Sequence, residues 1–234
     1  MRFSTLLLSA ALPCAALCAT YDAAGRTSML ARHNDVRRGV SPTAADMTLL
    51  TWDSDLADAA SDYAERCVFQ HDSNRGDGFD SSVGENLAAG YPIENQTPVA
   101  DWADEAQWYS FSTNSCQAGK VCGHHTQIIW ADSTRLGCGY ATCTGNEIGF
   151  NEAPSGDVVL YTVCRYSPAG NFVGQAPYVA GEACSQCNED THPYCVDGLC
   201  SETEGVPEEN DDDAAASVAA SLLAASLAVA ALVL

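Results

Sequence analysis

Twelve cysteines are the feature that most constrains the fold of this 234-residue chain. Two of them, Cys14 and Cys18, lie in the first 19 residues, where a single arginine precedes an apolar run that ends in small residues. This pattern is typical of a secretory signal peptide, so we expect residues 1–19 to be removed. The ten cysteines that remain predict five disulfides, formed in an oxidising compartment.

The C-terminal end carries a second segment of unusual composition. Residues 218–234 contain only Ala, Ser, Val and Leu. As a helix they would extend about 25 Å, which is shorter than a bilayer core of about 30 Å. Small residues around positions 212–217 precede this tail, as in a glycosylphosphatidylinositol (GPI) attachment signal, and we expect Asp213 to be the attachment residue. A membrane-spanning helix and a weak terminal helix are the alternatives.

Residues 201–217, just before this tail, concentrate acidic side chains and contain no aromatic residue. Such a segment cannot bury enough apolar surface to order itself, so we expect a solvated stalk. The chain as a whole has a formal net charge of -21. This charge excludes a nucleic-acid-binding function, which requires a basic face. It also predicts repulsion from anionic lipid headgroups.

Helical and strand patterns follow one another along the middle of the chain. The first helical segment places four residues on one face: Met29, His33, Val36 and Val40. His33 is therefore expected to be a buried structural histidine rather than a ligand. Further helices should begin after Asp53 and at Pro98. Residues 135–143 and 157–164 have the pattern of strands, so the sequence predicts the α+β class.

The helix that begins at Pro98 carries one carboxylate on its apolar face. Glu105 is three residues after Trp102 and four residues before Tyr109, so all three side chains share that face. A carboxylate in apolar surroundings requires a hydrogen-bonding or charged partner. Glu105 is therefore a candidate site residue.

Four cysteines near the end of the chain form a separate compact block with few apolar residues. Their spacing is Cys184-x2-Cys187-x7-Cys195-x4-Cys200. Zinc binding is one interpretation of such spacing, but an exported chain favours disulfides. The sequence alone does not fix which cysteines pair.

The longest motif of the chain lies just past its middle. It reads Gly123-His124-His125-Thr126-Gln127-Ile128-Ile129-Trp130. Three further blocks are His33-Asn34-x-x-Arg37, Gly84-Glu85-Asn86-Leu87 and Cys164-Arg165-Tyr166-Ser167-Pro168-Ala169-Gly170-Asn171. Together the four blocks resemble the signatures of the CAP superfamily, which includes cysteine-rich secretory proteins, antigen 5 and the pathogenesis-related 1 proteins. His125 departs from the family pattern, which usually has Phe or Tyr at this position.

The resemblance implies a domain organisation and a fold. A CAP domain should cover residues 26–175 as a three-layer α-β-α sandwich around a small, mostly antiparallel sheet. A small disulfide-rich, hinge-like block should follow over residues 181–200. By the same resemblance, the expected disulfides are Cys67–Cys138, Cys116–Cys122, Cys143–Cys164, Cys184–Cys195 and Cys187–Cys200.

The resemblance also implies a central cleft lined by two histidines and two acidic residues. In this chain they are His71, Glu85, Glu105 and His124. Two neutral imidazoles suit Zn²⁺ or a similar divalent cation. The two carboxylates would be further ligands or would fix the orientation of the imidazole rings. The alternative is a hydrogen-bonded polar network that holds the helices to the sheet.

Three aromatic residues, Trp108, Tyr109 and Phe111, lead into the segment Cys116-x5-Cys122. Family members that bind sterols have an aromatic-bearing loop at the corresponding place. The resemblance therefore implies that this loop and the adjacent cleft hold a sterol or fatty acid. The same aromatic residues fit a place in the hydrophobic core equally well.

The sequence contains no His-Glu-x-x-His or Gly-x-Ser-x-Gly motif, and no cysteine is free if all ten pair. We therefore expect a non-enzymatic monomer that is exported, held at the cell surface by a lipid anchor and able to bind lipid. The alternatives are an extracellular protein-interaction module of defence or virulence type, and a metal-dependent hydrolase. Asn95 begins a glycosylation acceptor, Asn95-Gln96-Thr97, which should lie on the surface.

Overall fold

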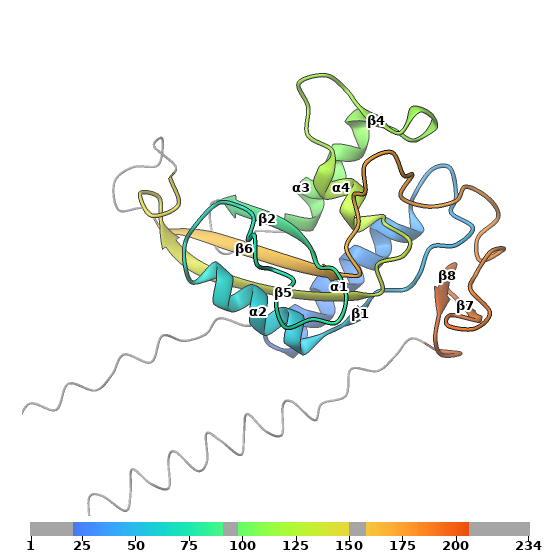
Figure 1. Ribbon diagram of the computed structural model, residues 1–234, viewed down its shortest axis with the longest axis horizontal. Coiled ribbons are helices and arrows are strands. Elements are labelled where there is room, and N and C mark those ends of the chain that lie inside the picture. The colour runs from blue at the N-terminus through green and yellow to red at the C-terminus, as the bar shows by residue number, and fades with distance from the viewer. Residues whose placement is uncertain (1–20, 91–97, 150–157, 206–234) are drawn as a thin grey trace, which may run out of the picture.

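The computed structural model describes residues 21–90, 98–149 and 158–205 of the chain (Figure 1). The expected signal peptide, the glycosylation residue Asn95, the attachment residue Asp213 and the apolar tail lie outside the described residues. Within the described ranges, no helix combines the length and the apolar character that crossing a membrane requires.

A four-stranded sheet forms the centre of the molecule (Figure 1). Its strands lie in the order β1 (Thr51–Trp52), β5 (Arg135–Thr144), β6 (Val158–Ser167) and β2 (Gly84–Gly90). Only the short β1 runs parallel to its neighbour β5, whereas the other two pairs are antiparallel. The expected small, mostly antiparallel sheet is thus confirmed, and both predicted strands continue beyond their predicted ends.

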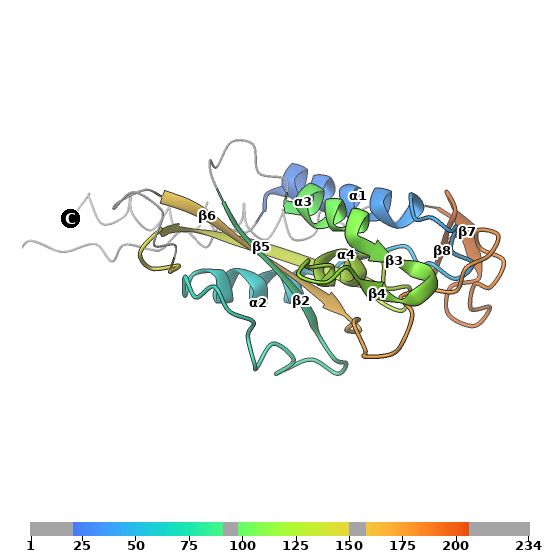
Figure 2. The same cartoon turned by 90° about the horizontal axis from the view of Figure 1, so that it is seen from above.

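Helices cover both faces of this sheet. Figure 2 shows α2 (Ser54–Ala64) on one side and α1 (Ala23–Arg38) with α3 (Pro98–Asp104) on the other. The short α4 (Gly123–Ile128), which carries the longest motif, lies beside α3. These elements form the expected three layers of an α+β fold.

Capping side chains fix where two of these helices begin. Asp22 accepts a hydrogen bond from the backbone N–H of Gly25 at the start of α1, and Asp53 accepts one from Leu56 at the start of α2. The helix that begins at Pro98 changes after Asp104 into a 3₁₀ turn, η1 (Glu105–Trp108). The predicted helical segment therefore ends at Trp108, but its last turn is tighter than an α-helix.

Two glycines of β5 allow α2 to lie directly on the sheet. A Cβ atom added to Gly137 would clash with the backbone of Leu56 and Ala57, and one added to Gly139 would clash with Ser61. Both glycines therefore face α2. Because successive residues of a strand point to opposite faces, Cys138 points to the other side, where it joins the core beneath α1 and α3.

This alternation corrects two of the expected disulfides. The structure has Cys67–Cys143 and Cys138–Cys164 in place of Cys67–Cys138 and Cys143–Cys164. Cys138 and Cys164 are direct cross-strand partners of β5 and β6, with Cα atoms 4.1 Å apart. Cys143 lies on the α2 face, where the chain emerging from α2 brings Cys67 to it. The bridges Cys116–Cys122, Cys184–Cys195 and Cys187–Cys200 form as expected.

The cysteine-rich block is joined to the domain by main-chain hydrogen bonds. It contains the hairpin of β7 (Tyr194–Val196) and β8 (Leu199–Ser201). The backbone of Cys200 donates to Met47 O and accepts from Leu49 N, at 2.8 and 2.7 Å. Arg38, at the end of α1, forms a 2.8 Å ion pair with Asp197 in the hairpin turn. These contacts hold the block against the domain beside the end of α1.

Candidate functional site

Glu105 and His124 form the first of two histidine–carboxylate pairs. Glu105 Oε1 lies 2.6 Å from Nδ1 of His124, and its other oxygen, Oε2, accepts the backbone N–H groups of His124 and His125 at 3.0 and 3.1 Å. Burial would raise the pKa of the Glu105 carboxyl, but these hydrogen bonds lower it below its usual range. The partner that the sequence demanded for Glu105 is thus the first turn of α4.

His71 and Glu85 form the second pair. Nδ1 of His71 lies 2.9 Å from Glu85 Oε1, and the Glu85 side chain is fully buried whereas that of His71 is 58% exposed. The buried guanidinium of Arg165 lies on the other side of Glu85, with Nε 3.6 Å from Oε2. Arg165 also forms a 2.7 Å ion pair with Asp72. Glu85 therefore receives charge compensation from Arg165 and orients the exposed ring of His71.

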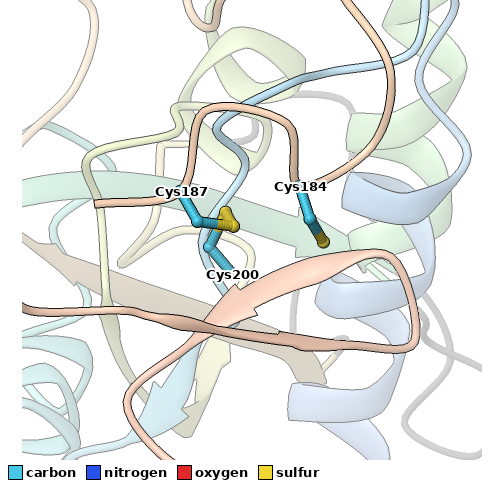
Figure 3. A group of neighbouring side chains, drawn as sticks. All are labelled: Cys184, Cys187 and Cys200. Atoms are coloured by element: carbon cyan, nitrogen blue, oxygen red, sulfur yellow. A yellow bond between two sulfur atoms is a disulfide. The ribbon is translucent and has the colours of Figure 1, made fainter. Parts of the chain in front are cut away.

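These two pairs do not merge into one compact ligand cluster. Among the described residues, the one group of three or more His, Cys, Asp or Glu ligand atoms within 4.8 Å of one another is Cys184, Cys187 and Cys200 (Figure 3). Those sulfur atoms are already bonded in the bridges Cys184–Cys195 and Cys187–Cys200, so they offer no thiolate to a metal. In the two His–Glu pairs, each carboxylate occupies Nδ1 and leaves Nε2 for a ligand.

A cavity of about 410 Å³ lies between the end of α1, the helical segment 98–108 and the residues that follow β6. Its lining is mainly apolar and consists of Val36, Gly39, Val40, Ser41, Ala103, Ala106, Tyr109, Phe111, His125, Ile129 and Tyr178. The volume is within the range of small-molecule sites, roughly 300 to 1,000 Å³. Two of the three predicted lipid-binding aromatic residues, Tyr109 and Phe111, are in this wall, and Phe111 stacks on Tyr178 with ring centroids 4.4 Å apart.

Trp108, the third aromatic residue, lies elsewhere. Its backbone carbonyl accepts a hydrogen bond from Gln117 N, and the ammonium of Lys120 lies 4.1 Å above its ring. Trp108 therefore supports the loop closed by the Cys116–Cys122 bridge. The structure separates it from the lining of the 410 Å³ cavity.

His125 places a polar ring in the otherwise apolar wall of this cavity. The residue is 7% exposed, and its Nδ1 is buried with no hydrogen-bond partner among the residues that the structure describes. Burial lowers the pKa of His125, although the nearby Glu105 carboxylate opposes this effect, so the neutral imidazole is favoured. The departure from Phe or Tyr at this position therefore adds a neutral hydrogen-bonding ring to the cavity wall.

Arg37 holds the segment after α4 in place, a role that the sequence did not reveal. The side chain is 1% exposed and donates to five main-chain carbonyls, at distances from 2.7 to 3.2 Å. These carbonyls belong to Thr48, Ile128, Trp130, Ala131 and Ser133. The spacing His33-Asn34-x-x-Arg37 is consistent with this role, because it places His33 and Arg37 on one side of α1.

His33 is the buried structural histidine that the sequence predicted. It is fully buried, with Nδ1 2.7 Å from Met29 O and Nε2 2.8 Å from the hydroxyl of Tyr166. Burial lowers its pKa to about 4. Asn86 donates to the same Tyr166 hydroxyl and to the carbonyl of His124, so this network connects α1 to β6, β2 and α4.

Comparisons with known proteins place this fold and these motifs in one family. The sequence model described as CAP, cysteine-rich secretory protein family, matches residues 30–166. Peptidase inhibitor 16 of Homo sapiens is 39% identical over 186 residues, which are 79% of this chain and 37% of that protein. GLIPR1-like protein 1 of Bos taurus is 40% identical over 179 residues, covering 74% of this chain and 69% of that protein. The chain thus spans little more than a third of the length of the first relative.

Solved structures agree with this assignment. Venom allergen-like protein 4 of Schistosoma mansoni aligns with a TM-score of 0.54 and 29% identity, over 67% of this chain and 94% of that protein. The crystal structure of NaASP2 with Zn²⁺ aligns with a TM-score of 0.54 and 26% identity, over 78% of this chain and 97% of that protein. The chain belongs to the CAP family of cysteine-rich secretory proteins.

Proposed function

We propose that this chain is an exported, non-enzymatic CAP protein that binds a sterol or fatty acid in the 410 Å³ cavity. The observation that carries the proposal is the lining of this cavity. There, aliphatic side chains at the end of α1 and just beyond it meet the rings of Tyr109, Phe111 and Tyr178. An apolar ligand would gain about 25 cal/mol for each Å² of apolar surface that it buries there.

The polar group in this cavity favours a ligand with one hydrogen-bonding end. The imidazole of His125 is part of the cavity lining, and a neutral imidazole has one nitrogen that accepts a hydrogen bond. A sterol hydroxyl donates a hydrogen bond to a neutral imidazole nitrogen, while the ring system of the sterol occupies the apolar wall. This pairing makes a sterol our first choice of ligand.

Matched aromatic substitutions test the proposal. Phe111 lines the cavity and Trp108 does not, although both belong to the segment that the sequence singled out. We expect Phe111→Asp to abolish saturable binding of labelled cholesterol, whereas Trp108→Gln leaves the affinity nearly unchanged. Equal loss in both variants would place the ligand outside this cavity, and the absence of saturable cholesterol and palmitate binding to the unmodified protein would refute the proposal.

We also propose a second ligand, a divalent cation held by Nε2 of His71 and His124. Metal-binding histidines commonly donate their second ring N–H to a carboxylate, and Glu85 and Glu105 provide such acceptors at 2.9 and 2.6 Å. The relative NaASP2 was crystallised with Zn²⁺. The carboxylates would orient the rings rather than bind the ion directly. When bound, such an ion would supply Lewis acidity, but two imidazole ligands form an open site.

Calorimetric titration tests the cation site directly. We expect Zn²⁺ to bind the unmodified protein, and His71→Gln with His124→Gln to abolish the heat. Glu105→Gln should weaken binding by about 10- to 100-fold, which is the usual effect of losing such an orienting group. An unchanged titration in the double histidine variant would exclude this site.

We propose that the mature chain is displayed at a cell surface by a GPI anchor attached near Asp213. Support comes from the five disulfides, which suit an oxidising compartment, and from the composition of residues 212–234. Treatment of expressing cells with phosphatidylinositol-specific phospholipase C should release the protein into the medium. Retention on the cells after complete digestion of a known anchored protein would contradict the anchor.

A further inference from the structure

Two long stretches of this acidic chain contain no acidic residue at all. The sequence has 31 Asp and Glu residues, yet none lies in residues 106–131 or in residues 158–181. The first stretch contains the Cys116–Cys122 loop and α4, and the second contains β6 and the segment that follows it. The fold brings parts of both stretches together on one face, around the loop that carries β4 (Ser115–Cys116) (Figure 1).

An open groove of about 350 Å³ lies where these two stretches meet, and none of the described residues that line it carries a carboxylate. Its two walls are the Cys116–Cys122 loop and the segment 171–177. Asn114 Nδ2 donates to Gln175 O and Asn171 Nδ2 donates to Gly123 O, both at 2.8 Å. The Cys116–Cys122 bridge closes the loop itself. These contacts therefore fix the two walls of the groove relative to each other.

Large apolar side chains are exposed around this groove. Phe172 and Val173, which line it, are 49% and 103% exposed, and Val121, between the lining residues Lys120 and Cys122, is 60% exposed. Clustered exposed apolar side chains of this size commonly mark a contact surface. The groove thus combines exposed apolar side chains with a lining that, among the described residues, contains no carboxylate.

Lys120 supplies the only ammonium side chain of the protein, since the sequence contains no other lysine. It is exposed at the edge of the groove, above the ring of Trp108. A lysine beside aromatic and aliphatic side chains is the combination found at lipid interfaces, where the amine contacts phosphate and the rings lie at headgroup depth.

We propose that this acid-free face docks on a lipid surface of zwitterionic headgroups. Val121, Phe172 and Val173 would enter the interfacial region, and Lys120 would contact lipid phosphates. Because the rest of the chain is strongly negative, an anionic surface would repel it. At physiological salt this repulsion acts over a Debye length of about 8 Å. The proposal does not depend on a ligand in the 410 Å³ cavity, which lies beside this face and shares Tyr109 with the groove.

The single lysine provides a direct test with the full chain. Apart from the N-terminal amino group, Lys120 is the only amine that an acylating reagent can label. With phosphatidylcholine vesicles present, we expect mass spectrometry to show acylation of Lys120 slowed about fivefold, which corresponds to about 1 kcal/mol. If the apolar terminal segments alone bound the vesicles, we would expect the reactivity of Lys120 to be the same in Val173→Asp as in the unmodified protein.

A matched pair of variants completes the test. Val173 is fully exposed, so Val173→Asp should fold normally and lose the protection of Lys120. Val158→Asp, at a site 52% exposed outside the groove, should retain the protection. Adding phosphatidylserine should reduce the protection. Unchanged acylation with vesicles, protection that survives in Val173→Asp, or protection that requires phosphatidylserine would overturn the proposal.

Discussion

Glu105 caps the helix that carries His124 and orients the ring of the same residue. One carboxylate oxygen lies 2.6 Å from Nδ1 of His124, and the other accepts its backbone N–H at 3.0 Å. The side chains are only 14% and 27% exposed, respectively, so water has limited access to either. A single partly buried carboxylate thus links the fold of α4 to the position of a candidate metal-binding histidine.

Removing this carboxylate should weaken the fold. In Glu105→Ala, two N–H groups of the first turn of α4 and the His124 ring lose their acceptor. We expect the free energy of unfolding to fall by about 2 kcal/mol, as for other hydrogen bonds to charged groups. Asp104→Ala is the control, because that exposed side chain makes no capping hydrogen bond. Equal urea midpoints for both variants would show that Glu105 has no such role.

Stability should decrease on acidification because of His33. The folded protein protonates His33 only near pH 4, whereas the unfolded chain does so near its ordinary pKa of about 6.5. Between these values the unfolded state binds more protons, so lowering the pH favours it. The loss of folding free energy due to His33 reaches about 3 kcal/mol at pH 4 and is absent above pH 7.

Other buried groups also titrate, so the test compares slopes rather than single values. Unfolding free energies measured from pH 7 to pH 4 should fall less steeply for His33→Gln than for the unmodified protein. Glutamine keeps a polar side chain beside Tyr166 but cannot gain a proton in this range. Parallel pH profiles of the two proteins would contradict the assignment to His33.

The glycines of β5 should not tolerate a side chain. In Gly139→Val, the new side chain would overlap Ser61 of α2, and both backbones are held in the core. We expect a loss of about 1 to 3 kcal/mol or more in stability, as for other overpacked cores. Gly76→Ala, where an added Cβ meets nothing within 4 Å, should leave the thermal midpoint nearly unchanged. A Gly139→Val protein as stable as Gly76→Ala would disprove close packing of α2 on β5.

The layers of the fold followed from local patterns in the sequence. The Asp53 cap, the β-rich run ending at Cys164 and the carboxylate on the helix that begins at Pro98 each predicted a feature that the structure contains. In each case the relevant partners lie within a few residues of one another, or the residue's own chemistry demands a partner. Short-range patterns of this kind are the part of a fold that a single sequence displays most clearly.

Pairings between residues far apart in the chain were harder to predict from the sequence. The expected Cys67–Cys138 and Cys143–Cys164 bridges ignored the alternation of β5, which points Cys138 and Cys143 to opposite faces of the sheet. The glycines that flank Cys138 could have indicated the correct pairing, because residues without a side chain mark the face of the strand on which a helix packs. The role of Arg37 gave no such signal, because its acceptors are main-chain carbonyls, which have no sequence signature.

His125 should determine which ligands the cavity accepts. His125→Phe replaces the polar ring with an apolar one of similar size, so a ligand hydroxyl would lose its acceptor. We expect this variant to bind cholesterol about 5- to 160-fold more weakly, the effect of about 1 to 3 kcal/mol, and to bind a cholesteryl ether of the same ring system with little change. Competition assays with both ligands measure the difference. Equal losses for the two ligands would indicate a change of cavity shape instead.

Photocrosslinking tests the lipid-binding cavity most directly. A diazirine-bearing cholesterol, bound to the full-length protein and activated by light, should attach to peptides from residues 36–41 or 103–111, which line the 410 Å³ cavity. Excess unlabelled cholesterol should prevent the attachment, and Phe111→Asp should abolish it. Attachment confined to residues 116–122 and 171–177, or attachment that excess cholesterol does not reduce, would contradict a lipid-binding role for this cavity.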